Sequence, residues 1–115
     1  TVVLNELKNN SFFVFKHADL SSVHSIAIGV GSGDKLNKFS GGRIELRLDS
    51  PTGPLAGKVP VPSKNAPVNM EFSEVVLPLE ARSDGKFHDL YFVVKNENNP
   101  SQPAAAVDWV RFDLR

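Results

Sequence analysis

The side chains in this chain that could carry out chemistry are few and widely scattered. His17, His24 and His88 lie far apart without the His-Glu-x-x-His spacing of a zinc site, and the chain contains no cysteine. No Gly-x-Ser-x-Gly sequence occurs, so the nucleophile elbow of a hydrolase is not predicted. The glycines of segment 29–34 precede no helical pattern that could place a helix N-terminus on a phosphate. The sequence therefore predicts neither an enzyme nor a nucleotide-binding loop.

Side chains suited to hydrogen bonding are concentrated in one long polar segment, 96–102. It reads Asn-Glu-Asn-Asn-Pro-Ser-Gln and contributes the amide groups of Asn96, Asn98, Asn99 and Gln102. Long polar loops on a rigid framework are where binding residues are commonly found. The segment is thus a candidate binding loop, and a solvated connection without a ligand is the alternative.

The position of Asp108 within its predicted strand indicates which way its side chain points. It alternates with Val110 and Phe112, which predicts that its side chain points toward the protein interior. A carboxylate there needs either a cation or several hydrogen-bond donors. Both alternatives remain open from the residues alone.

The elements that must position these groups are strands. Ile44, Leu46 and Leu48 alternate with charged residues, as in a half-buried strand. Further strands are predicted at 11–16, 25–30, 55–61, 71–79, 87–95 and 107–114, and no segment sustains a helical period. The strand segments contain Phe12, Phe13, Phe15, Phe72, Phe92, Phe112 and Trp109, and most of these aromatic side chains are expected in the core. Trp109 has the phase opposite to Asp108, so it either faces the second side of the final strand or is covered by a neighbouring loop. Many short strands separated by Pro- and Gly-rich turns predict an all-β fold, an antiparallel two-sheet β-sandwich.

Composition limits the number of domains and the kinds of partner that the chain can have. The 115 residues fit one domain spanning 1–115, and 13 basic residues balance 13 acidic ones. A neutral chain lacks the cationic surface that nucleic acids and anionic membranes attract, and its apolar runs are too short to span a bilayer. The chain begins without an initiator methionine, so we expect a piece excised from a larger protein.

Three stretches resemble the family 6 carbohydrate-binding modules. Segment 41–62 is similar to the family's central strand, Pro-Thr-Gly turn and strand. Segment 88–96 resembles its penultimate strand, and 107–112 resembles its closing strand with the Asp108-Trp109 pair. The resemblance implies a jelly roll of the galactose-binding-domain type. It also implies a non-catalytic module, attached to a secreted polysaccharide-acting enzyme.

The sugar site that the resemblance implies departs from the family pattern. The family's cleft holds a sugar between two aromatic rings beside an Asn, but these positions correspond to Glu6, to Asn69 or Met70, and to Ala106. The usual cleft is therefore expected to be degenerate or relocated. A relocated carbohydrate-binding site would lie on the rim formed by Glu6, Asn69, Met70 and the loop with Asn96, Asn98, Asn99 and Gln102.

The resemblance also implies a structural calcium, held in the family by a Glu-x-Glu strand and the Asp of the closing pair. Asp108 remains as the metal ligand, but no Glu-x-Glu precedes Ser11. We therefore expect the family's N-terminal metal-binding strand to be missing. A calcium ion and backbone N–H groups that donate hydrogen bonds are two equally weighted predictions for the partner of Asp108.

The leading hypothesis is a non-catalytic carbohydrate-binding module of an extracellular or periplasmic protein. Its partners would be a polysaccharide or oligosaccharide and the neighbouring domains of the parent protein. The alternative is a structural or protein-interaction sandwich that has lost sugar binding, which the absent stacking pair favours.

Overall fold

The computed structural model describes residues 4–31, 40–61, 72–79 and 85–114, and all regular structure within these ranges is β-strand. The strands are β1 (Leu4–Leu7), β2 (Phe12–Asp19), β3 (Val23–Gly31), β4 (Gly42–Leu48), β5 (Leu55–Val61), β6 (Phe72–Pro78), β7 (Phe87–Lys95) and β8 (Ala105–Leu114). No helix in these ranges is long and apolar enough to cross a membrane.

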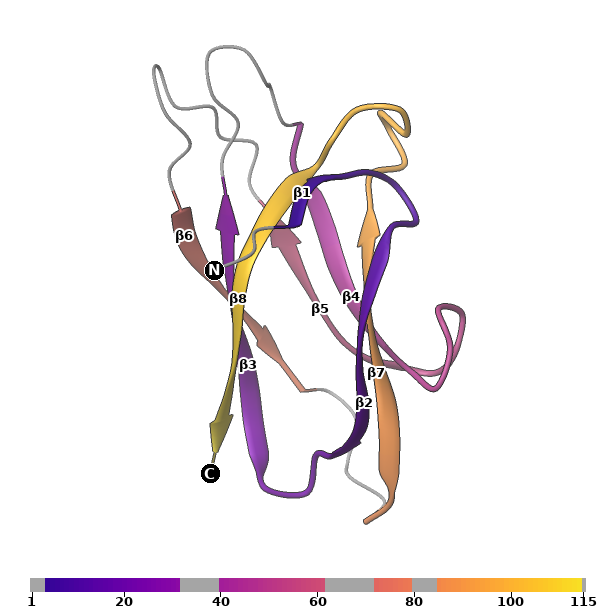
Figure 1. The fold of residues 1–115 in the computed structure, drawn as a ribbon, viewed down its shortest axis with the longest axis vertical. Coiled ribbons are helices and arrows are strands. Elements are labelled where there is room, and N and C mark those ends of the chain that lie inside the picture. Colours follow the sequence, from indigo (N-terminus) through magenta and orange to yellow (C-terminus); the bar gives the residue numbers. More distant parts are fainter. Residues whose placement is uncertain (1–3, 32–39, 62–71, 80–84, 115) are drawn as a thin grey trace.

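The strands form two four-stranded antiparallel sheets that face each other (Figure 1). Sheet A has the order β1-β8-β3-β6, and sheet B has the order β2-β7-β4-β5. Because consecutive strands often lie in different sheets, chain connections cross repeatedly between the layers. The predicted all-β, two-sheet sandwich is confirmed.

Each predicted strand corresponds to an observed one, but the first observed strand was missed. Leu4–Leu7 forms β1 at the edge of sheet A, where Leu4 pairs with Val107 of β8. Four residues are too few for alternation to be recognised. The expectation that the N-terminal strand would be missing is therefore wrong, because β1 occupies that place. The strand does not contain the Glu-x-Glu sequence.

Strand β2 continues three residues beyond its predicted end. The register shifts between Phe15 and Ala18, and His17 has a φ of 58°, a left-handed conformation that an alternation pattern does not reveal. Such an irregularity is a β-bulge, which lets a strand bend without ending. The strand therefore continues to Asp19.

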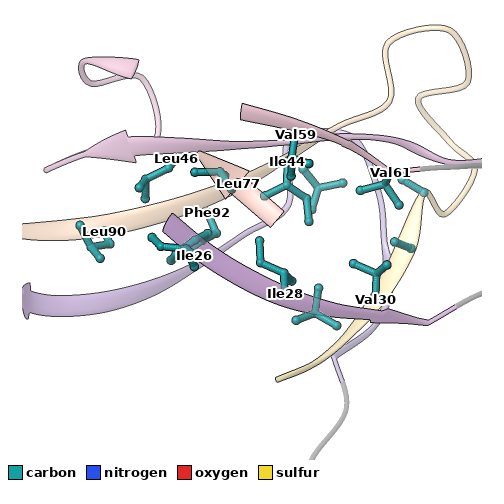
Figure 2. Packing of buried hydrophobic residues seen from close by; sticks show 14 of the residues in the cluster. Ile26, Ile28, Val30, Ile44, Leu46, Val59, Val61, Leu77, Leu90 and Phe92 are labelled. Carbon is teal, nitrogen blue, oxygen red and sulfur yellow. The ribbon is translucent and has the colours of Figure 1, made fainter. Parts of the chain in front are cut away.

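The hydrophobic core lies between the inner faces of the sheets (Figure 2). Ile26 and Ile28 from sheet A meet Ile44, Leu46 and other apolar residues from sheet B, and all four are fully buried. In β3, β4 and β7 every second residue belongs to the core, as the alternation predicts. This packing fixes which side chains face outward on each sheet.

The aromatic residues divide between the core and the surface. Phe92 is fully buried and stacks on Phe13 with ring centroids 5.0 Å apart. In contrast, four of them are exposed, namely Phe12, Phe15, Phe72 and Trp109, with exposed fractions of 47%, 38%, 44% and 37%. The expectation that most strand aromatics would be in the core is wrong for Phe12 and Phe72, which occupy the outward phase of their strands. It is also wrong for Phe15, which is exposed although its ring contacts Phe92 and Phe112. Trp109 faces the outer side of β8, one of the two positions that its phase left open.

Candidate functional site

A hollow of about 360 Å³ opens where β4 begins and β5 and β7 end. It is formed by Gly42, Arg43, Pro60, Lys95, Asn96, Glu97 and Asn98, and we call it the loop-end hollow. The 96–104 connection arches over this end of the sandwich (Figure 1). The described residues that form the hollow include no aromatic side chain, and most of them carry a polar or charged group.

Gly42 allows β4 and β7 to approach closely beside the hollow. A Cβ atom at this position would collide with the carbonyl oxygen of Lys95. Gly42 also has a φ of 156°, outside the range that side chains readily adopt. The glycine therefore sets the position of Arg43 and Lys95 at the rim.

An ion-pair network lines one side of the hollow. Arg43 donates from Nε to Glu45 at 2.8 Å and from Nη1 to Glu97 at 2.7 Å, and Arg47 donates from Nη2 to Glu45 at 2.9 Å. Burial by itself raises the pKa of Glu45. The hydrogen bonds and the positive charges of Arg43 and Arg47 together outweigh burial and hold this pKa below its usual value. Glu45 therefore stays ionised and fixes both guanidinium groups.

Asn96 organises the loop above the hollow. Its side chain is buried, with 5% of the residue exposed, and its amide nitrogen donates to Ser40 Oγ at 2.7 Å. The same nitrogen donates to the carbonyl oxygens of Asn99 and Gln102, both at 2.8 Å. Two N–H groups thus serve three acceptors, so one hydrogen is shared. The donors of Asn96 are used within the loop and to tie the loop to Ser40, and its role there is structural.

The turn between β1 and β2 holds the other side of this loop. The backbone N–H of Asn96 donates to Asn9 Oδ1 at 2.8 Å, and Lys95 Nζ donates to Asn10 Oδ1 at 2.6 Å. Asn10 has a φ of 70°, which asparagine tolerates better than most residues. The end of β7 is therefore fixed from both sides.

The outer face of sheet B continues from the hollow to a pair of aromatic rings. Strand pairing places Lys95 beside Arg43, and the next outward row contains Phe12 and Glu45, joined through Val93. Phe12 lies 5.4 Å from Tyr91, centroid to centroid, in a tilted arrangement. A polar hollow and two rings therefore share one face.

The structure brings together some of the residues predicted for sugar binding. Asn98 lines the hollow, and the neighbouring loop residues Asn99 and Gln102 are exposed. The backbone of Glu6 lies in β1, on the other sheet, and its side chain is outside the described part of the chain. Asn69 and Met70 also lie outside the described residues.

Sequence reasoning missed Phe12, Arg43 and Lys95 as candidates. Phe12 was assigned to the core, although its phase is opposite to that of Phe13, which packs on Phe92. Arg43 has the same outward phase as Arg47, and the alternation of charged and apolar residues in 43–48 predicts this direction. That three strands bring these residues together could not be seen without the strand order.

Asp108 is the residue that the family resemblance implies as a calcium ligand. Asp108 is half-buried in β8, whereas its neighbour Trp109 is exposed. Among the described side chains, no group of three or more His, Cys, Asp or Glu is placed to hold a metal ion. Calcium prefers six to eight oxygen ligands, and one carboxylate supplies at most two. Calcium binding therefore stays a prediction.

Comparisons with known proteins agree with this architecture. No curated protein matches the chain. A β-1,3-glucan binding module from Bacillus halodurans is 28% identical, with a TM-score of 0.72, over 93% of this chain and 72% of that one. A family 6 module from Clostridium cellulolyticum, solved with xylose, is 26% identical, with a TM-score of 0.68, over 93% and 74% of the two chains.

A third similar structure is a much larger enzyme. It is a family 43 arabinoxylan arabinofuranohydrolase from Bacillus subtilis in complex with cellotetraose, 23% identical with a TM-score of 0.74. The match covers 96% of this chain but only 20% of the enzyme, so the likeness concerns the fold of one part. The family model described as carbohydrate binding module (family 6) matches residues 2–114. The chain therefore belongs to family 6 of the carbohydrate-binding modules.

Proposed function

We propose that this module binds a neutral oligosaccharide on the outer face of sheet B, from the loop-end hollow to the rings of Phe12 and Tyr91. The observation that carries the proposal is that the polar hollow and the aromatic pair lie side by side on one face. A pyranose has apolar C–H faces that pack on rings and hydroxyl groups that need directional partners. Family membership supports a saccharide as the ligand.

Polar groups suited to hydroxyl recognition surround the hollow. Lys95 and Arg43 donate, the amide of Asn98 donates and accepts, and Glu97 accepts. Arg43 is already fixed by Glu45 and Glu97, so it loses little side-chain freedom when a sugar binds. Binding is nevertheless weak, roughly millimolar, because Phe12 and Tyr91 are tilted and cannot enclose a sugar ring between them.

The module acts in this proposal as the non-catalytic, saccharide-directed part of a larger secreted protein. Its site is relocated relative to the aromatic cleft that the family resemblance implies. The likeness to one part of a polysaccharide-acting enzyme supports an accessory role, with the chemistry performed elsewhere in the parent protein.

The test is isothermal titration with cellotetraose, xylotetraose and a β-1,3-linked glucotetraose. Tyr91→Ala and Asn98→Ala should each weaken binding about fivefold, because each removes contacts worth about 1 kcal/mol. The matched control is Phe87→Ala, which removes an exposed ring (58%) at the start of β7, away from the hollow. No heat at high sugar concentration, or equal weakening by the control, would refute the site and favour a structural or interaction role.

A further inference from the structure

The outer face of sheet A carries an aromatic platform that the proposed site does not use. Strand pairing places Trp109 of β8, Gly29 of β3 and Glu74 of β6 in one row across three strands. The next row contains Arg111, Ala27 and Val76. We call Trp109, Arg111, Asp113, Glu74 and Val76 the Trp109 face.

The indole of Trp109 lies directly on the backbone of Gly29. A Cβ atom at Gly29 would collide with Nε1 and Cε2 of the indole and come within 2.7 Å of Cδ1. Any other residue at position 29 would therefore lift the ring from the sheet. Gly29 is itself buried, while 37% of Trp109 is exposed. One face of the ring is fixed against the sheet, so the exposed part is a rigid apolar surface.

Arg111 is held beside this ring by two carboxylates from different strands. Its Nε lies 2.7 Å from Asp113 Oδ1, and its Nη1 lies 3.2 Å from Glu74 Oε1. The ion pair between Arg111 and Glu74 spans β3, and β3 has only the small side chain of Ala27 beside Arg111. The guanidinium carbon is 5.6 Å from the Trp109 ring centroid. A positioned donor therefore stands next to the aromatic surface.

The charge of this cluster favours a neutral, hydroxyl-rich ligand. Arg111 has five N–H groups, and the described residues use three of them: Nε and Nη2 with Asp113, and Nη1 with Glu74. The remaining donors can bind hydroxyl oxygens, while the carboxylates can accept hydroxyl protons. One guanidinium between two carboxylates leaves the cluster with a net negative charge, which disfavours phosphate-bearing and uronic-acid ligands.

We propose that the Trp109 face is a second saccharide-binding surface, which stacks a neutral β-linked pyranose on Trp109 and hydrogen-bonds it through Arg111 and Glu74. This inference rests on the proposed saccharide function of the module, but it concerns the opposite sheet. Equatorially substituted sugars such as glucose and xylose units present the flat C–H face that a single exposed ring can pack against. Two surfaces facing away from each other would let one module contact two chains of a polysaccharide.

The chain offers a direct probe, because Trp109 is its only tryptophan. Intrinsic fluorescence titrated with cellotetraose and xylotetraose therefore reports on this face alone. We expect a saturable change in emission, and Arg111→Ala should weaken the apparent affinity about fivefold while leaving the fluorophore in place. Phe87→Ala is the control that should not alter the titration.

Further variants separate this proposal from the proposed function. Asn98→Ala and Tyr91→Ala change the sheet B surface and should leave the fluorescence titration unaltered. Trp109→Ala should remove one class of sites from the calorimetric titration. If Trp109→Ala does not fold, Arg111→Ala still tests the face, because it keeps the ring on Gly29.

Two results would overturn the inference. One is calorimetric binding without any change in tryptophan emission, which would leave the sheet B site standing by itself. The other is emission that varies with protein concentration in the absence of sugar, together with dimers in sedimentation that Trp109→Ala abolishes. That second result would identify the face as a contact between copies of the chain.

Discussion

Asn96 gives the sharpest stability prediction. Asn96→Ala removes an amide whose two N–H groups serve Ser40, Asn99 and Gln102, and it leaves these acceptors without their donor. Each lost hydrogen bond costs about 1 kcal/mol net, so two donors correspond to about 2 kcal/mol of unfolding free energy. Water can reach the exposed loop at Asn99 and Gln102, which keeps the cost from rising further.

This free energy translates into a measurable melting shift. Unfolding entropy scales with chain length, and for 115 residues a loss of about 2 kcal/mol lowers the melting temperature by about 8 °C. Differential scanning calorimetry measures this directly. Asn96→Asp should be more damaging than Asn96→Ala at neutral pH, because it turns a carboxylate toward the two carbonyl oxygens that the amide now serves.

The matched control is Asn98→Ala, the same substitution two residues further along the same loop. Asn98 is exposed, so its loss should change the unfolding free energy by less than about 0.5 kcal/mol. If Asn96→Ala and Asn98→Ala melt together, close to the unmodified protein, then the buried amide does not hold the loop and the reasoning is wrong.

Three further predictions concern the acid response, the core and the metal. The pKa of Glu45 is lowered in the folded state, so ionised Glu45 stabilises the fold fully above the unfolded pKa of about 4.3, and this contribution is lost as pH falls through the folded pKa. Glu45→Gln should therefore cost about 1 kcal/mol of unfolding free energy at neutral pH and make the melting temperature depend less on pH between 5 and 3, which thermal melts at several pH values measure. Phe92→Ala should cost about 3–5 kcal/mol in denaturant unfolding because Phe92 is fully buried against Phe13, whereas Phe12→Ala on the surface should cost about 1 kcal/mol or less. A calcium ion bound at Asp108 would make the melting temperature higher in calcium than in chelator, and equal values would remove that prediction.

The fold follows from the sequence wherever alternation is long enough to read. Ile44, Leu46 and Leu48 predict one face of β4, and the structure places the first two in the core. Strand β1 was missed because four residues carry too little pattern, and β2 was predicted too short because the left-handed His17 leaves no mark in the hydrophobicity. Local pattern thus specifies strands, and it fails where a bulge or an edge interrupts them.

The candidate surfaces were predicted less completely. The polar loop with Asn98 was recognised, but whether an asparagine faces the ligand or holds the loop depends on its tertiary partners, as the contrast of Asn96 with Asn98 shows. Phe12 was expected in the core from its residue type, which describes an average and not a particular face. The phase of Trp109 left a surface position and a covered position open, and only the packing of β8 on β3 decides between them.

The sequence by itself determined the all-β class, the neutral charge and the family, because these depend on composition, alternation and short motifs. Only the tertiary structure decided which side chains share a surface. Phe12 meets Tyr91, and Trp109 lies on Gly29 beside an Arg111 that reaches Glu74, through pairings between strands far apart in the chain. Strand order and register arise from the packing of the whole core, and no local segment contains that information.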